Sequence, residues 1–469
     1  MRVPRLRLSR RVRARLRAQR RWWRSRLRDT ARGEVLFPLA GRGMVAVGTL
    51  AGPAGAPSGD EPSGAPAKGA VATPAAEERA GIERAAPGPR IAVLHATAGS
   101  GHKRAAEALA AAVAGLDPRA TVREVDTLVF ASRWYRGTYA ASYNAMAAHA
   151  PRLWGALYHS WAMAPVNRST APVRLALDRL NLRRLVRVVE RERPDAVVCT
   201  HFLPVEALSP QRGRGAGAPL YCVITDFAAH PFWAFPHVDR YFVAAATVAD
   251  ELAGHGVPRE RIEVTGIPVD PKFAERVGRE AARERFGLDP VRPLVLVMGG
   301  GQGVGPLGEL AERLTGLAPA LQVLVVCGTN ARLRDQIDHL PAGRIGRIRT
   351  LGFTHEVSVL LEACDVVVGK AGGLTCSEAL VKGAPLVVFK PTPGQEVRNA
   401  RFLAAAGAAV HADSVEEVAA TTARWLGDPA ERERVRQAQA RLARPEAAAA
   451  IARRVLADVA KRHGAAHSG

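Results

Sequence analysis

The chain has 469 residues, 48% of them hydrophobic, which is enough for about two or three domains with ample cores. Its formal net charge of +22 at pH 7 favours an anionic partner, such as a membrane surface, a nucleic acid or an acidic substrate. The five cysteines are scattered without a C-x-x-C pair, and no apolar run reaches the roughly 18 residues of a membrane span, so the composition argues against a disulfide framework, a zinc site and a transmembrane helix.

Residues 1–89 are predicted to form a basic head followed by a disordered linker. Residues 1–30 contain thirteen Arg and one Asp, and residues 51–89 are rich in Ala, Gly, Pro and Ser. Such a head favours docking on anionic lipid, at about 1 kcal/mol for each basic residue near the surface. Two alternatives stay open, namely nonspecific RNA binding and a true start of translation downstream, for example at Met44. No motif typical of specific nucleic-acid recognition accompanies the head.

The folded body is predicted to begin at residue 90, with a first domain over residues 90–268. Short apolar runs alternate there with segments of helical period. The expected strands are Ile91–Ala96, Thr121–Val125, Ala196–Thr200, Leu220–Thr225 and Arg240–Ala244, and the expected helices include Arg104–Val113 and Leu177–Glu190.

A second domain over residues 269–427 is predicted to repeat this plan, and a helical segment is predicted over residues 428–469. The last helices, about Val415–Ala466, are expected to pack back on the first domain. The expected strands are Leu294–Met298, Gln322–Cys327, Arg347–Leu351, Asp365–Gly369 and Leu386–Phe389. This alternation predicts an α/β protein with two doubly wound parallel sheets. Ligands of such sheets bind beyond the carboxyl ends of the strands, here in a cleft between the domains.

Each domain opens with a strand, a glycine loop and a helix. The loops lie in HATAGSGHKRAAEAL from His95 and in VLVMGGGQGVGPLGEL from Val295. Neither ends in the GK[ST] of a P-loop, and neither matches G-x-G-x-x-G, so a P-loop NTPase and a nicotinamide dehydrogenase are disfavoured. The glycines serve either as tight turns alone or as phosphate contacts from two sides of one cleft.

The stretch Asp365–Leu403 predicts a nucleotide-sugar pocket. It reads as a strand, a turn with Gly372 and Gly373, a helix opening at Thr375, a second strand and a loop with PGQE. A helix N-terminus suits a phosphate, and Glu378 one turn later suits a ribose diol. Two alternatives stay open: Thr375 to Glu378 is also a capping box, and the PGQE loop is also compatible with a solvated turn.

Four segments together have a known counterpart. They are the Gly99-Ser100-Gly101-His102 loop; Thr225-Asp226-Phe227 with His230 and Trp233; Gly299-Gly300-Gly301; and GKAGGLTCSEAL with PGQE. Over roughly Arg90 to Leu403 the chain resembles the diacylglycerol glycosyltransferases of the monogalactosyldiacylglycerol synthase type. These belong to glycosyltransferase family 28, with the lipid-linked N-acetylglucosaminyltransferase of peptidoglycan synthesis. Ser100 departs from the family's commoner triple glycine but leaves His102 in register.

The resemblance implies a GT-B fold, in which two Rossmann-like doubly wound domains face a cleft. It also implies a UDP-sugar donor, inversion at the anomeric carbon, and neither a cofactor nor an obligatory metal. The chain contains no Asp-x-Asp pair to hold a metal on a diphosphate. A helix dipole and backbone N–H groups would then neutralise the leaving UDP.

The donor-side residues follow from the resemblance by position. The set comprises Gly300 and Gly301 in the loop of the second domain; Gly372, Gly373, Leu374 and Thr375 on the diphosphate; Glu378 on the ribose; Gln395 and Glu396 on the transferred sugar; and Phe353 beside the uracil. Lys370 either adds positive charge near the phosphates or is simply solvated.

A general base is expected on the first domain, where it would take the proton of the acceptor hydroxyl. The candidates are Asp226, His102 and His230, and we favour Asp226 with His102 in support. His102 could instead contact a phosphate or a lipid headgroup, and Asp226 could merely cap the turn before Pro231.

An aromatic segment between Trp134 and Trp161 is predicted to contact the acceptor or the membrane. Its members include Trp134, Tyr135, Tyr139, Tyr143 and Trp154, and the three tyrosines recur at i, i+4 and i+8. Aromatic rings at headgroup level beside arginines are typical of an interfacial segment. A helix that packs in the core accounts for the pattern equally well.

The sequence therefore predicts a peripheral enzyme at the cytoplasmic face of a membrane. It would move a hexose from a UDP-sugar to diacylglycerol or a related lipid, with an anionic membrane surface and no specific nucleic acid among its partners. The alternatives are a UDP-N-acetylglucosamine transferase for another lipid-linked acceptor, a UDP-sugar epimerase of GT-B fold, and a non-catalytic binding module.

Overall fold

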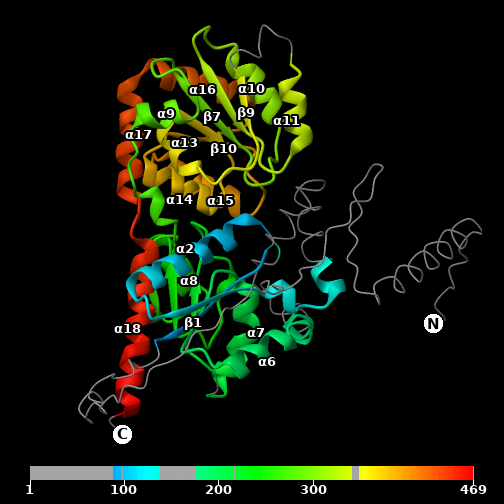
Figure 1. Ribbon diagram of the computed structural model, residues 1–469, viewed down its shortest axis with the longest axis vertical. Coiled ribbons are helices and arrows are strands. Elements are labelled where there is room, and N and C mark those ends of the chain that lie inside the picture. Colours follow the sequence, from blue (N-terminus) through cyan, green and yellow to red (C-terminus); the bar gives the residue numbers. More distant parts are fainter. Residues whose placement is uncertain are drawn as a thin grey trace, which may run out of the picture. The chain divides into compact units, whose positions relative to one another are not determined.

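The computed structural model describes residues 88–97, 99–137, 160, 175–215, 217–340 and 348–467. Residues 84–469 form one compact unit (Figure 1). Nearly all of the predicted head and linker lies outside the described residues, as do Tyr139, Tyr143 and Trp154. All five cysteines are described, and each is buried and free of any disulfide.

Six strands of the described first domain form a parallel sheet in the order β2-β1-β3-β4-β5-β6. They are β1 (Arg90–His95), β2 (Thr121–Asp126), β3 (Ala196–Cys199), β4 (Leu220–Val223), β5 (Arg240–Val243) and β6 (Ile262–Val264). The helices are α2 (Ser100–Leu116), α6 (Arg183–Glu192), α7 (Phe202–Gly213) and α8 (Ala246–Gly254), with short 3-10 helices that include η2 (Thr127–Phe130) and η3 (Pro231–Trp233). The predicted helix at Leu177–Glu190 is interrupted by a turn at Leu182.

Six strands of the described second domain form another parallel sheet, in the order β12-β11-β10-β7-β8-β9. They are β7 (Leu294–Met298), β8 (Gln322–Val326), β9 (Ile348–Leu351), β10 (Val366–Gly369), β11 (Leu386–Phe389) and β12 (Ala409–Ala412). The helices are α9 (Arg279–Arg285), α10 (Leu307–Thr315), α11 (Ala331–Asp338), α13 (Val357–Ala363), α14 (Gly373–Lys382), α15 (Gln395–Ala405), α16 (Val415–Gly427) and α17 (Pro429–Leu442).

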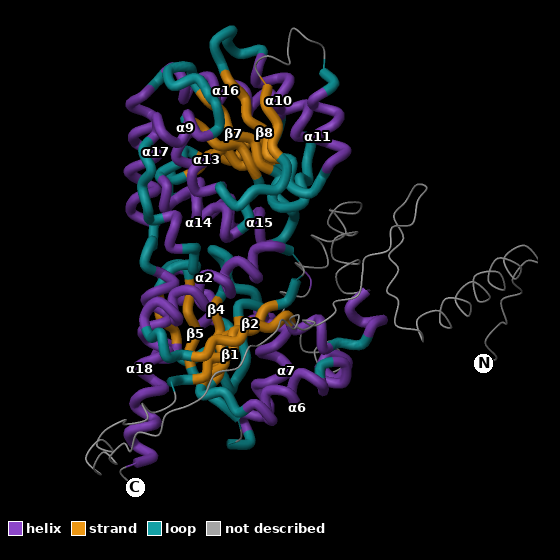
Figure 2. The backbone as a smooth tube through the Cα atoms, viewed as in Figure 1, coloured by secondary structure: helices purple, strands orange, loops and turns teal. Residues whose placement is uncertain are grey.

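Both sheets are covered by helices on their two faces, which explains their unbroken apolar strands. Every residue of β7 is buried, as is every residue of β10. In the second domain α10 and α16 pack on one face, while α13 and α14 belong to the core on the other (Figure 2). The predicted α/β class with two doubly wound parallel sheets is confirmed. The edge strands β6 and β12 were not predicted, because a polar residue interrupts each short apolar run, Glu263 in β6 and His411 in β12.

The C-terminal helix α18 (Ala447–His467) packs beside α2 on the first domain, as expected (Figure 1). The same expectation is wrong for α16 and α17, which pack on the second domain. Ile451, Ala452, Val455 and Val459 recur at helical spacing and are all buried in one cluster with the first sheet. The last helix of the chain therefore covers one face of the first sheet, although the second domain lies between them in sequence.

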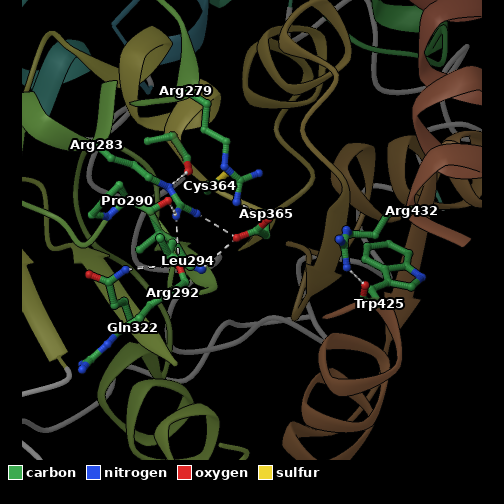
Figure 3. A network of polar contacts seen from close by, with 12 residues as sticks. Arg279, Arg283, Pro290, Arg292, Leu294, Gln322, Cys364, Asp365, Trp425 and Arg432 are labelled. Atoms are coloured by element: carbon green, nitrogen blue, oxygen red, sulfur yellow. Dashed lines mark hydrogen bonds and ion pairs between the residues drawn. The ribbon is translucent and has the colours of Figure 1, made fainter. Parts of the chain in front are cut away.

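A buried ion-pair network fastens α9 to the amino ends of β7 and β10 (Figure 3). The fully buried Arg283 donates to the carbonyl oxygens of Ala363, Pro290 and Arg292 and, at 2.9 Å, to Asp365 Oδ2. Asp365 Oδ2 also accepts a hydrogen bond from the Leu294 N–H. This network lies at the sheet edge opposite the glycine loops, so it supports the fold and does not reach the candidate site.

Candidate functional site

Loops from the carboxyl ends of both sheets meet within the compact unit. A Cβ placed on Gly301 would lie 3.4 Å from Ser100 Oγ, and one on Gly101 would lie 3.8 Å from Leu374 Cδ2. A Cβ on Gly373 would lie 1.9 Å from the Thr225 carbonyl oxygen, so only glycine allows this approach. The segments that carry the four sequence motifs are therefore brought together from positions far apart in the chain.

Helix α14 begins at Gly373, two residues before the predicted start at Thr375. Its N-cap is Gly372, and no side chain caps it. Thr375 lies inside the first turn, so the alternative of a capping box from Thr375 to Glu378 is wrong. The first N–H groups of a helix have no partner within the helix, and its positive dipole end favours an anion. The first N–H groups of α14 therefore lie where Gly373 packs against the backbone of Thr225.

Glu378 is a buried carboxylate on α14, with 1% of its surface exposed. Its Oε1 forms an ion pair with Arg104 on α2 of the first domain. Its Oε2 is buried and has no hydrogen-bond partner among the described residues. Burial raises the pKa of Glu378 to about 7, against the pull of Arg104. One oxygen thus remains to accept a hydrogen bond from a ligand hydroxyl.

Gln395 and Glu396 are the first two residues of helix α15 rather than part of a loop. The preceding Gly394 has a φ of 100°, a conformation that favours glycine. Glu396 Oε2 accepts a hydrogen bond from the Thr392 N–H at 2.6 Å and lies 3.3 Å from Lys370 Nζ. The Glu396 side chain is only 17% exposed, so it does not belong to a freely solvated turn. Lys370 is not simply solvated, because its side chain is 24% exposed and its Nζ donates a hydrogen bond to Thr392 Oγ1 at 2.6 Å.

His102 is held by the ends of two neighbouring strands. Its Nδ1 lies 2.7 Å from the Thr200 carbonyl oxygen and 2.9 Å from Thr225 Oγ1. Because a carbonyl oxygen can only accept, Nδ1 carries the proton and Nε2 keeps its lone pair. Burial lowers the pKa of His102 to about 4, so the imidazole is neutral near pH 7.

Asp226 follows β4 and forms a hydrogen bond with a residue of the second domain. Its Oδ1 accepts a hydrogen bond from Asn399 Nδ2 at 2.8 Å, and burial raises its pKa to about 6. It does not cap the turn before Pro231. That role belongs to His230, whose Nδ1 accepts a hydrogen bond from the Phe232 N–H.

His201 was missed by the sequence reasoning. Its ring centroid lies 4.5 Å from that of His102, and it is surrounded by Phe202 and Trp233. Its Nδ1 accepts a hydrogen bond from the Leu203 N–H at the start of α7, and burial lowers its pKa well below the usual range. Its place directly after an apolar strand, like that of Asp226, is the signal that could have identified it.

Phe353 is one of the few large apolar side chains that are exposed, at 57%. It follows β9, its ring lies 5.1 Å from the His355 ring, and its Cε2 would lie 4.0 Å from a Cβ on Gly301. The neighbouring Gly300 has a φ of 72°. An exposed ring beside the second glycine loop is available to stack on a planar ligand.

The two described residues of the predicted aromatic set, Trp134 and Tyr135, differ in solvent exposure. Trp134 is 73% exposed, whereas Tyr135 is 8% exposed and its hydroxyl donates to Asp178 Oδ1. The interfacial expectation is therefore wrong for Tyr135, because its ring packs in the core of the first domain. A second bond, from Ser132 Oγ to Asn181 Oδ1, ties the same two segments together.

Family models match both halves of the chain. The model described as monogalactosyldiacylglycerol (MGDG) synthase matches residues 102–269, and the model of the glycosyltransferase family 28 C-terminal domain matches residues 294–449. The two matches fall on the first domain and on the second domain with its following helices.

Named relatives agree with the family models. A processive diacylglycerol beta-glucosyltransferase of Bacillus licheniformis is 33% identical over 247 residues, which are 52% of this chain and 64% of that protein. One of Bacillus cereus is 34% identical over 278 residues, which are 59% of this chain and 71% of that protein. The chain thus spans less than two thirds of the length of the first of these relatives.

The structure is also similar to solved glycosyltransferases. CalG4, the calicheamicin glycosyltransferase, superposes with a TM-score of 0.52 at 16% identity, over 79% of this chain and 98% of that one. A likeness at this level of identity shows the fold alone. It confirms the predicted arrangement of two Rossmann-like domains as a GT-B fold.

Proposed function

Because the chain belongs to the diacylglycerol glycosyltransferases of the monogalactosyldiacylglycerol synthase type in family 28, we propose that it transfers a hexose from a UDP-sugar to diacylglycerol or a related membrane lipid. One observation carries the proposal. The start of α14, the buried Glu378 on α14, and the base candidates Asp226 and His102 all belong to segments that meet between the two sheets.

The donor is proposed to bind along the second domain. Its diphosphate lies at the start of α14, where Gly373, Leu374 and Thr375 supply N–H groups and the helix dipole offsets negative charge. The ribose hydroxyls bind Glu378 Oε2, and the uracil stacks on Phe353. Gln395 and Glu396 contact the transferred sugar from the start of α15.

Catalysis is proposed to proceed by one displacement. The acceptor hydroxyl oxygen attacks the anomeric carbon, the bond from that carbon to the UDP oxygen breaks, and the hydroxyl proton passes to Asp226. A single displacement inverts the configuration. The α14 dipole and its first N–H groups stabilise the charge that develops on UDP, so no metal is required in the pocket. His102 is fixed through Thr225 next to Asp226, and its Nε2 lone pair would accept a hydrogen bond from the acceptor and so help to orient it for the base.

The acceptor is proposed to reach the first domain from a membrane surface at its cytoplasmic face. Trp134, Leu177 and Leu180 are each more than half exposed and lie on two short segments joined by the Tyr135–Asp178 hydrogen bond. Exposed arginines accompany them on the same segments: Arg133, Arg136 and Arg179. Apolar side chains beside arginines suit the boundary between headgroups and acyl chains. In the described part of the chain, no helix has the length and hydropathy to cross a bilayer.

The direct test is transfer of label to lipid. The purified protein would be incubated with labelled UDP-glucose, UDP-galactose or UDP-N-acetylglucosamine and with vesicles of diacylglycerol and anionic phospholipid. Label in the organic phase is the expected result, and it would identify the sugar. Absence of label in lipid from every donor, with UDP binding intact, would contradict the proposal. Conversion of the UDP-sugar to its epimer without lipid would favour an epimerase instead.

A further inference from the structure

Asn399 forms three hydrogen bonds that join three segments, using both of its N–H donors and its carbonyl oxygen. This fully buried side chain on α15 donates from Nδ2 to Asp226 Oδ1 at 2.8 Å and to the Ala371 carbonyl oxygen at 2.9 Å. Its Oδ1 accepts a hydrogen bond from the Phe227 N–H at 2.8 Å. Two donors and one acceptor of a single amide therefore join the loop after β4, the loop before α14, and α15 itself.

Two neighbours on α15 hold the same loop of the first domain. Arg398 donates to the Ala229 carbonyl oxygen at 2.7 Å and to Glu251 Oε1 at 2.6 Å, while Glu251 Oε2 accepts from the Ala229 N–H. One turn further on, the Phe402 ring stacks on Phe227 with centroids 5.2 Å apart. Helix α15 thus holds the loop that carries Asp226, although Asp226 and Asn399 are 173 residues apart in sequence.

We propose that Asn399 is a positioning residue that holds the Asp226 carboxylate and links it to the two ends of the donor site. The proposal rests on the proposed function, in which Asp226 is the base. Helix α15 begins with Gln395 and Glu396, and Ala371 directly precedes Gly372, the N-cap of α14. The amide fixes Oδ1 and leaves Oδ2 for the acceptor hydroxyl.

A neutral amide is suited to this task because charged groups of both signs already lie near Asp226. Glu396 on α15 raises the pKa of Asp226, and Arg398 on α15 lowers it. The buried Cys376 thiol on α14 is a further, neutral neighbour. On the first domain, the neutral His102 contacts the adjacent Thr225. The Asn399 N–H stabilises the ionised carboxylate without adding a charge of its own.

The test compares Asn399→Asp and Asn399→Ala with the wild type in the vesicle assay from about pH 5 to pH 9. The aspartate variant keeps the shape of Asn399 but adds a carboxyl group, and the alanine variant removes the donor. Both should move the acidic limb of kcat upward by about one pH unit, while KM for the UDP-sugar changes less than about threefold.

A matched control is Gln439→Glu. Gln439 is a fully buried amide on α17 that donates to the carbonyl oxygens of Ala384 and Ala408. Its replacement buries an acid in the same domain, so it should lower the melting temperature and leave the acidic limb in place.

The outcomes separate this inference from the proposed function. If Asp226→Asn keeps full activity, the assignment of the base fails. If Asp226→Asn is inactive and folded Asn399 variants keep the wild-type limb, the inference alone fails. If neither Asn399 variant folds while Gln439→Glu does, Asn399 is structural and the inference is overturned as well.

Discussion

At the scale of single residues, the candidate site is defined by buried ionisable groups with opposed pKa shifts. Burial raises the pKa values of Glu378 and Asp226 and lowers that of His102. Burial disfavours the charged form, so carboxyl groups become weaker acids and imidazoles weaker bases. Groups perturbed in this way gather at functional sites more often than elsewhere.

Glu378→Gln should weaken donor binding without weakening the fold. The folded pKa of about 7 lies above the usual value, so the folded protein retains a proton that the unfolded chain releases. Ionisation of Glu378 therefore costs stability as the pH rises from about 4.5 through 7. We expect KM for the UDP-sugar to rise at least about tenfold, because a charge-assisted hydrogen bond to the ribose is lost.

Melting curves at two pH values provide the matching check on Glu378→Gln. At pH 8 the variant should melt no lower than the wild type, and at pH 5 the two should coincide. A large loss of stability at both pH values, or an unchanged KM, would contradict the ribose assignment.

The pH dependence of the rate distinguishes the two bases. Asp226 must be ionised to accept a proton, so kcat should fall as the pH drops through about 6. His102, with a pKa of about 4, would give a limb near that value instead. The measurement is kcat against pH at saturating donor, with Asp226→Asn and His102→Gln beside the wild type. A limb near pH 4 would transfer the role of base to His102.

At the scale of elements, the candidate site and the structural ion-pair network lie at opposite ends of the strands. The carboxyl ends of the strands hold the glycine loops, Asp226 and His102. The amino ends of β7 and β10 hold the Arg283–Asp365 network instead (Figure 3). This division follows from parallel strands, since all of their carboxyl ends share one edge.

Arg283→Ala should destabilise the second domain strongly. It removes the buried partner of Asp365 and the donor to several carbonyl oxygens, and the loss of one partner of a buried pair costs about 3–5 kcal/mol. Arg292→Ala is the matched control, because that side chain is 56% exposed in a surface pair worth about 1 kcal/mol or less. The free energy of unfolding in urea would compare them, and equal losses would refute the role given to Arg283.

At the scale of the whole molecule, the C-terminal helices connect the second domain back to the first. Helix α17 belongs to the second domain, and α18 packs on α2, which begins at the first glycine loop. The ion pair from Arg398 to Glu251 and the contact of Arg104 with Glu378 add polar links. Binding of a donor at Glu378 is therefore expected to act on both domains.

Membrane docking is a property that the exposed patch on the first domain should control. Replacement of Trp134, Leu177 and Leu180 together by Glu should reduce sedimentation with anionic vesicles by about tenfold, since apolar insertion is lost and charge repulsion is gained. Transfer to a short-chain, water-soluble acceptor should persist. Val291→Glu, at an 86% exposed position of the second domain, is the control. Unchanged sedimentation of the triple variant would exclude this patch as the docking surface.

The sequence by itself determined ten of the twelve described strands, the parallel sheets and the segments of the candidate site. Runs such as Leu294–Met298 are apolar throughout because helices cover both faces of the sheet, and this pattern is local. The glycine motifs are local too, since a loop that must approach a ligand or another backbone needs glycine within a few residues of the strand end.

Only the tertiary structure decided which partners the site residues have. Arg104 pairs with Glu378, Asn399 holds Asp226, and Tyr135 is buried against Asp178, and none of these pairs is close in sequence. Such contacts depend on how separate helices dock, and no periodicity within one segment encodes that docking. The same reason explains why His201 was missed, because its contact with the His102 ring joins positions 99 residues apart in sequence.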